Sequence, residues 1–127
     1  MAGFQHDNTT NWVEFRRLPN LVEVDFHWSD GRREVEYWEA MAEVERVALE
    51  SLRNAQARGT SYVLMTHGSS TSEGWRQQTA RSAIRGLMRS KTASRYIVRN
   101  RCIQHATCFV AAIRLVAASG QKSGARC

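Results

Sequence analysis

The chain has 127 residues, 43% of them hydrophobic and 24% charged, which predicts one soluble globular domain with a core of its own. It contains no apolar run near the roughly 18 residues that span a bilayer, and residues 1–11 lack the order of a signal peptide, so we expect a cytoplasmic protein. The net charge of +6 is uneven: residues 1–50 hold 5 basic and 11 acidic residues, whereas residues 51–127 hold 13 basic residues and one acidic residue. This asymmetry favours a polyanionic partner, above all nucleic acid, over an ordinary solvated basic surface.

The first half of the chain predicts an irregular arm, a strand and a long helix. Residues 1–20 form the arm, with a short helix around residues 11–17. Residues 21–27 alternate, so that Val22, Val24 and Phe26 share one face and Glu23, Asp25 and His27 the other. Residues 33–57 have apolar residues at helical spacing and six glutamates, which predicts an amphipathic helix.

The second half predicts a strand over residues 62–66, a loop, and a helix over residues 73–89. Two further strands are expected over residues 96–99 and 108–114, and the end of the chain, from residue 115 to residue 127, is predicted to be a flexible tail.

This order, β-α-β-α-β-β, predicts an α/β fold. We expect a two-layer sandwich in which a four-stranded mixed sheet carries two helices on one face, because right-handed crossovers place both helices on the same side. The opposite face, which would carry Glu23, Asp25 and His27, is expected to be open. The domain is predicted to span residues 21–114.

Polar residues follow the first two strands where each strand ends. If these strands are parallel neighbours, Asp25, His27 and His67 meet at one sheet edge, where catalytic groups collect in open α/β sheets. A carboxylate beside an imidazole orients it and raises its pKa, which suits general acid–base catalysis. The alternative for Asp25 and His27 alone is a polar pair that is merely satisfied at a strand end.

The loop after the second strand has the composition of an anion site. Gly68 permits close approach of a backbone, and four hydroxyl residues follow it before a helix begins. The alternative for this loop is that Thr71 or Ser72 simply caps the helix. In the helix, three arginines spaced by four could each hold a phosphate, and a solvated helical face is an equally ordinary interpretation. The predicted phosphate-binding residues are Gly68, Ser69, Ser70, Thr71, Ser72, Arg81, Arg85 and Arg89.

A metal site is left open by the sequence. Asp25, His27, His67 and His105 could in principle bind one ion, but their spacing matches no structural zinc pattern, and His105 is expected in a turn. The three cysteines show no C-x-x-C spacing and are expected to be reduced. No cofactor is required by the pattern, with Mg²⁺ as the one candidate.

The motifs at the two strand ends resemble those of the Smr (small MutS-related) domain family. Residues 24–27, Val-Asp-Phe-His, are similar to the family's Asp-Leu-His-Gly; Glu39-Ala40 is similar to its Glu-Ala helix signature; and residues 66–70, Thr-His-Gly-Ser-Ser, are similar to its His-Gly-x-Gly. The resemblance spans about residues 21–114. It implies a fold like the C-terminal domain of translation initiation factor three and a nuclease that nicks DNA or cleaves RNA.

The resemblance assigns catalysis to Asp25, His27 and His67 and phosphate contact to Gly68. Trp28 and Ser70 stand where the family has glycines. We therefore carry two main hypotheses, a probable endonuclease and a non-catalytic nucleic-acid-binding module on the same fold. A protein-interaction domain that docks its acidic helix on a basic partner is a third. Oligomeric state is not predicted.

Overall fold

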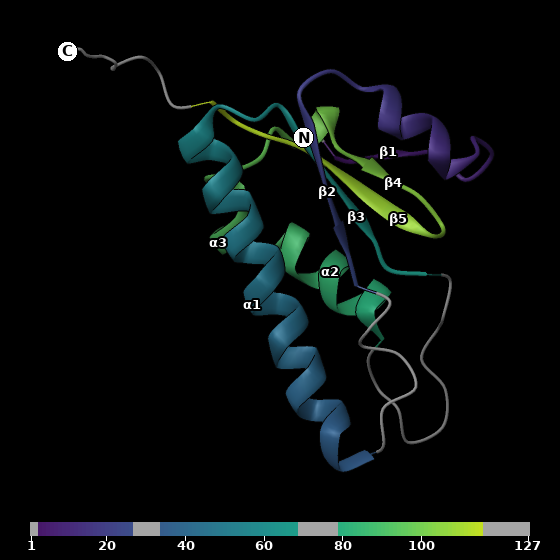
Figure 1. Ribbon diagram of the computed structural model, residues 1–127, viewed down its shortest axis with the longest axis vertical. Helices are drawn as coiled ribbons and strands as arrows, with labels where there is room; N and C mark the ends of the chain where they lie inside the picture. Colours follow the sequence, from purple (N-terminus) through teal and green to yellow (C-terminus); the bar gives the residue numbers. More distant parts are fainter. Residues whose placement is uncertain (1–2, 27–33, 69–78, 116–127) are drawn as a thin grey trace.

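The structure, a computed structural model, describes residues 3–26, 34–68 and 79–115, with the backbone alone for residues 34–38 and 40. Figure 1 shows a twisted sheet with helices beside it. In chain order the elements are β1 (Gln5–His6), η1 (Trp12–Arg17), β2 (Leu21–Asp25), α1 (Glu34–Arg58), β3 (Tyr62–Thr66), α2 (Ala80–Arg89), α3 (Lys91–Ser94), η3 (Arg99–Arg101), β4 (Ile103–Gln104) and β5 (Cys108–Ala112).

The sheet is mixed, as expected, and the chain is α/β. Its strand order is β1-β4-β5-β3-β2. β2 and β3 are parallel neighbours joined through α1, while β5 runs antiparallel to both β3 and β4. The described sheet has five strands rather than the expected four, because Gln5 and His6 of the arm pair in parallel with β4. Two residues give too little alternation for sequence to reveal such a strand.

The main core lies between the sheet and α1 and α2. One stripe of α1 contributes Val44, Ala48 and Leu52, all fully buried, and α2 contributes Ala83, Ile84 and Met88. From the sheet, Phe26, Val63, Met65 and Phe109 face these helices. The expected placement of Val24 and Phe26 on one face of β2 is confirmed, since Val24 also packs against this core. No helix in the described ranges is both long and apolar enough to cross a bilayer.

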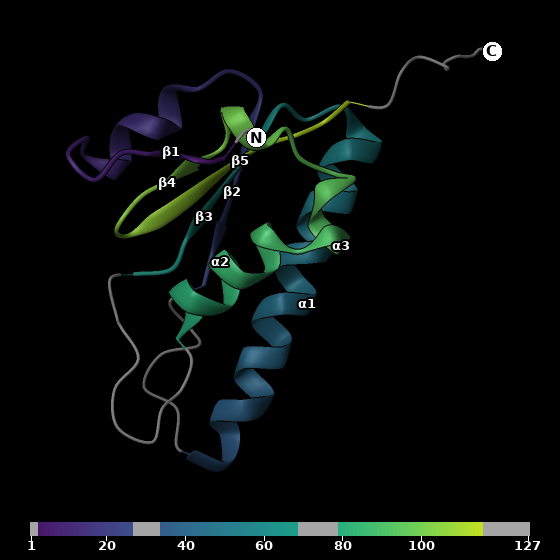
Figure 2. The same ribbon diagram turned by 180° about the vertical axis from the view of Figure 1, so that it is seen from behind.

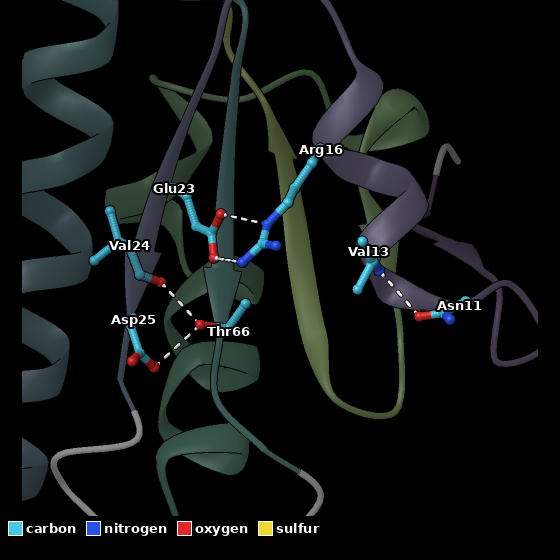
Figure 3. A network of polar contacts seen from close by, with 7 residues as sticks. All are labelled: Asn11, Val13, Arg16, Glu23, Val24, Asp25 and Thr66. Atoms are coloured by element: carbon cyan, nitrogen blue, oxygen red, sulfur yellow. Dashed lines mark hydrogen bonds and ion pairs between the residues drawn. The ribbon is translucent and has the colours of Figure 1, made fainter.

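The opposite face of the sheet is not open, contrary to expectation. η1 lies across it, and Phe15 packs with Leu64, Cys108 and Val110 in a second, smaller core (Figures 1 and 2). Arg16 of η1 donates from Nε and Nη2 to the two carboxylate oxygens of Glu23 on β2, at 2.8 and 3.0 Å (Figure 3). The apolar residues of the arm therefore cover the sheet, which period-two alternation in β2 alone could not reveal.

The predicted strand over residues 96–99 is wrong in extent. Only Ile97 forms a bridge, with Ile113, and Arg99 already belongs to η3. The elements α3 and η3, neither of which the sequence predicts, lie directly before and after this segment and leave little extended chain between them. The strand that pairs with β5 as a hairpin is β4 instead. β5 ends two residues earlier than expected, and the predicted helix start at residues 73–78 lies outside the described residues.

Candidate functional site

The carboxyl ends of β2 and β3 lie side by side, as the sequence predicts. Asp25 is the register partner of Thr66, and the Thr66 hydroxyl donates to Asp25 Oδ1 at 3.1 Å (Figure 3). Asp25 is an exposed residue at this edge of the sheet. His27 and Trp28 lie outside the described residues.

Asp25 and His67 belong to different sides of the sheet. Alternation puts Asp25 and Thr66 on the face that carries Leu64, which packs under η1. His67 follows Thr66 and is within electrostatic range of Arg81 and Arg85, which belong to α2 on the helical side. The structure thus brings the two strand ends together without bringing Asp25 and His67 onto one face.

The His67 side chain is completely buried and only half satisfied. Its Nδ1 lies 2.6 Å from the Gly68 carbonyl oxygen. A carbonyl only accepts, so Nδ1 carries the proton and Nε2 carries the lone pair in the neutral ring. Nε2 is buried and has no hydrogen-bond partner in the described part of the chain. Such a group is exceptional, because nearly all buried polar atoms are paired.

The surroundings of His67 keep it neutral. Burial lowers its pKa from 6.5 to about 4, and the positive charges of Arg85 and Arg81 act in the same direction. The hydrogen bond to Gly68 and, more weakly, the Cys108 backbone oppose this shift, although no bond of ordinary geometry reaches Nε2. At neutral pH the ring is therefore a buried hydrogen-bond acceptor beside two cations.

Gly68 is required by the backbone itself. Its φ is +82°, a conformation that residues with a Cβ adopt only at a cost. The N–H groups of His67 and Gly68 both donate to the Thr107 carbonyl, at 3.1 and 3.0 Å, which fixes this turn against the β4–β5 connection. The predicted anion-binding residues Ser69, Ser70, Thr71 and Ser72 lie outside the described residues. The described start of α2 is capped by Thr79, whose hydroxyl accepts from the Ser82 N–H at 3.3 Å.

The three arginines of α2 form one row along the β4–β5 turn. Arg81 Nη1 donates to the Ala106 carbonyl at 3.1 Å, Arg85 Nη2 to the His105 carbonyl at 3.1 Å, and Arg89 Nη2 to Gln104 Oε1 at 3.2 Å. The four-residue spacing thus matches three successive residues, of which Gln104 ends β4 and the other two lie in the turn. The sequence identified the row but not this structural use of it.

Within the described ranges, these contacts leave most guanidinium donors of the row without a partner. Each arginine has five N–H donors and uses one on the turn, and Arg85 Nε is buried without a partner among the described residues. Burial and the charges of Arg81 and Arg89 lower the pKa of Arg85, which remains cationic. A row of like charges with free donors is an environment that an anion would stabilise.

His105 lies in the β4–β5 turn, as expected, and is fully engaged there. Its Nε2 donates to the Thr10 carbonyl at 2.7 Å, and its Nδ1 accepts from the Thr107 N–H at 3.1 Å. The ring also packs edge-on against Phe15, with centroids 5.6 Å apart. In the described ranges no three His, Cys, Asp or Glu side chains lie close enough to hold a metal. His105 therefore has no free nitrogen for an ion.

Comparison with known proteins identifies no relative. No family model, no curated protein and no solved structure matches the chain. Function must therefore be inferred from the side chains at the end of β3 and along α2.

Proposed function

We propose that the protein binds nucleic acid and that a backbone phosphate is held between the end of β3 and the arginine row of α2. The observation that carries the proposal is the row of Arg81, Arg85 and Arg89, in which each guanidinium uses one donor on the described β4–β5 region and Arg85 Nε is buried without a partner there. A phosphate oxygen would take up the free arginine donors, and the compensated charge would relieve the repulsion along the row.

The overall charge supports the same partner. The +12 balance of residues 51–127 includes the whole of α2, and no acidic residue lies within α2. Binding that neutralises phosphates releases counterions, so the affinity should fall steeply as salt rises. The resemblance to the Smr family, which includes His67 and Gly68, agrees with a nucleic-acid partner.

Phosphodiester hydrolysis is the second candidate, favoured by the lone pair on His67 Nε2. This atom could accept a proton from a water that attacks phosphorus while the bond from phosphorus to the leaving sugar oxygen breaks. The leaving oxygen then needs a proton from another group. The sequence proposes His27, oriented by Asp25, which would act from the other side of the sheet edge from His67. Bound phosphate would raise the pKa of His67 by offsetting Arg81 and Arg85, which would make it a stronger base.

The binding proposal is tested with labelled single-stranded and duplex RNA and DNA by fluorescence anisotropy at 50 and 200 mM salt. We expect the double variant R81Q/R85Q to bind about 10-fold more weakly than the wild type and to lower the slope of log K against log salt by about 1 to 2. The matched control, R17Q/R46Q, removes two exposed arginines that pair with glutamates and should bind as the wild type does. Absence of salt-dependent binding by the wild type would refute the proposal.

Cleavage is tested on the same substrates with and without Mg²⁺. We expect H67A, H27A and D25N each to lose activity, by about 100-fold or more for a group that transfers a proton. Cleavage that survives in both histidine variants would remove the catalytic assignment. Binding without cleavage by the wild type would support the non-catalytic module.

A further inference from the structure

A second basic cavity lies between α1 and α3. Its volume is about 440 Å³, and it is lined by Leu49, Arg53, Lys91, Thr92, Arg95 and Tyr96. Figure 2 shows α3 beside α1, at the opposite end of the helical layer from the β4–β5 turn that the α2 arginines contact. The cavity is therefore separate from the site at the end of β3.

The charges that line this cavity are all of one sign. Arg53, Lys91 and Arg95 contribute three cations, and the lining contains no carboxylate. Within the described ranges, none of the three has an ion-pair partner, and Glu50, on the same helix as Arg53, already pairs with Arg46 at 3.4 Å. Other exposed arginines of the chain, such as Arg16 and Arg17, do have glutamate partners.

Tyr96 adds a phenolic hydroxyl to the lining of this cavity. Arg53 and, less strongly, Arg95 lower the pKa of that hydroxyl from 10.0. Arg53 belongs to α1 and Arg95 follows α3, so the cavity brings together cations from two elements. The Tyr96 side chain is half-buried and also packs against the main core.

We propose that Arg53, Lys91 and Arg95 form a second phosphate-binding pocket, which holds a backbone phosphate of a nucleic-acid strand. The inference rests on the proposed function, because it takes the same polymer as the ligand. Two guanidinium groups and an ammonium that line one cavity match the charge and the several acceptor oxygens of a phosphate. Contacts from these cations go to the backbone, so the pocket carries no base preference.

The position of the pocket suggests a continuous path for the strand. α2 is ten residues long, about 15 Å at 1.5 Å per residue, and separates Arg81 near its start from Lys91 just beyond its end. Arg85 and Arg89 lie between them in the chain. A strand that occupies both sites would contact several phosphates, which predicts a salt dependence steeper than the α2 row alone can produce.

The test compares two double variants that remove the same charge. R53Q/R95Q changes the pocket, whereas R17Q/R58Q removes two exposed arginines elsewhere. With a 20-nucleotide single strand at 100 mM salt, we expect the pocket variant to bind about 5- to 10-fold more weakly, with a salt slope lower by about 1, and the control to match the wild type. Equal losses in both variants would overturn the pocket, because they would reflect net charge alone.

An NMR titration locates the contact and separates it from the site on α2. In wild-type protein, and in R81Q/R85Q, the oligonucleotide should shift the amide signals of residues 91–96. If the oligonucleotide binds but these signals do not move, the pocket is refuted while the proposed function stands. If the wild type binds no oligonucleotide, both fail. Inorganic phosphate alone serves as the second probe: shifts with phosphate but not with the oligonucleotide would overturn the assignment to a strand.

Discussion

Two histidines in the described part of the chain, His67 and His105, are buried, yet their environments differ in a way that separates structure from function. His105 has partners on both ring nitrogens and an aromatic neighbour in Phe15. His67 has one partner, the carbonyl of the next residue, and its Nε2 is left beside cationic α2. Among the described histidines, only His67 has an unsatisfied buried ring atom, and only a proton or a hydrogen-bond donor at Nε2 would remove this energetic cost.

The satisfied histidine should dominate stability. His105→Ala removes hydrogen bonds to Thr10 and Thr107 and the contact with Phe15, and it leaves the Thr10 carbonyl without its donor. We expect the free energy of unfolding to fall by about 3 kcal/mol, measured by urea denaturation at pH 7. The control is His6→Ala, at an exposed position in β1, which should change stability by no more than about 0.5 kcal/mol. Similar effects of both variants would contradict the structural role of His105.

The unsatisfied histidine should dominate the response to acid. The pKa of His67 is lowered to about 4 in the folded protein, so the unfolded chain takes up the proton first as the pH falls below its ordinary value of 6.5. As the pH is lowered from 6.5 to 4, the free energy of unfolding should therefore decrease, and below pH 4 His67 should cause no further decrease. The total loss that corresponds to this difference in pKa is about 3 kcal/mol.

The variant His67→Leu isolates this contribution. It keeps an apolar group of similar size in the buried site, and it should lose less stability than the wild type when unfolding is measured at pH 7 and again at pH 4.5. If the wild type and the variant lose the same stability over this range, His67 is not held neutral by the fold.

The smallest effect concerns the link between the row of arginines and His67. Of the two arginines that oppose protonation of His67, Arg85 has the stronger effect, and Arg85→Met removes it. The pKa of His67 should then rise toward its ordinary value. It should remain below that value, because burial is the main cause of the shift. NMR titration of the imidazole signals measures this change. The matched control Arg89→Met removes a charge that is not among the influences on His67 and should leave its pKa unchanged.

Several elements could be predicted because their signals are local. β3 has the bounds expected from its apolar run, and α1 begins and ends within one residue of the prediction. The alternation of β2 correctly assigned Val24 and Phe26 to the helical side. By contrast, β1, α3 and η3 are only two to four residues long, too short to carry a readable period, and they form because tertiary contacts close them.

The candidate site also has parts that the sequence could predict and parts that it could not. The pairing of the strand ends followed from two parallel strands joined by a helix, and it is present in the register of Asp25 with Thr66. The hydrogen bonds of the arginine row to the β4–β5 turn could not be foreseen, since they join residues 15 to 25 positions apart. His67 and Asp25 are separated across the sheet because Asp25 pairs with Thr66, and His67, as the next residue, points to the opposite face.

By itself the sequence determined the α/β class, the basic second half and the chemistry available at the strand ends, because composition, periodicity and residue type are local properties. Only the tertiary structure decided which groups are buried, which are paired and which are not. Burial and pairing depend on segments far apart in the chain, such as η1 over β5 and α2 against the β4–β5 turn. That is why two histidines that look alike in the sequence differ so sharply in the folded protein.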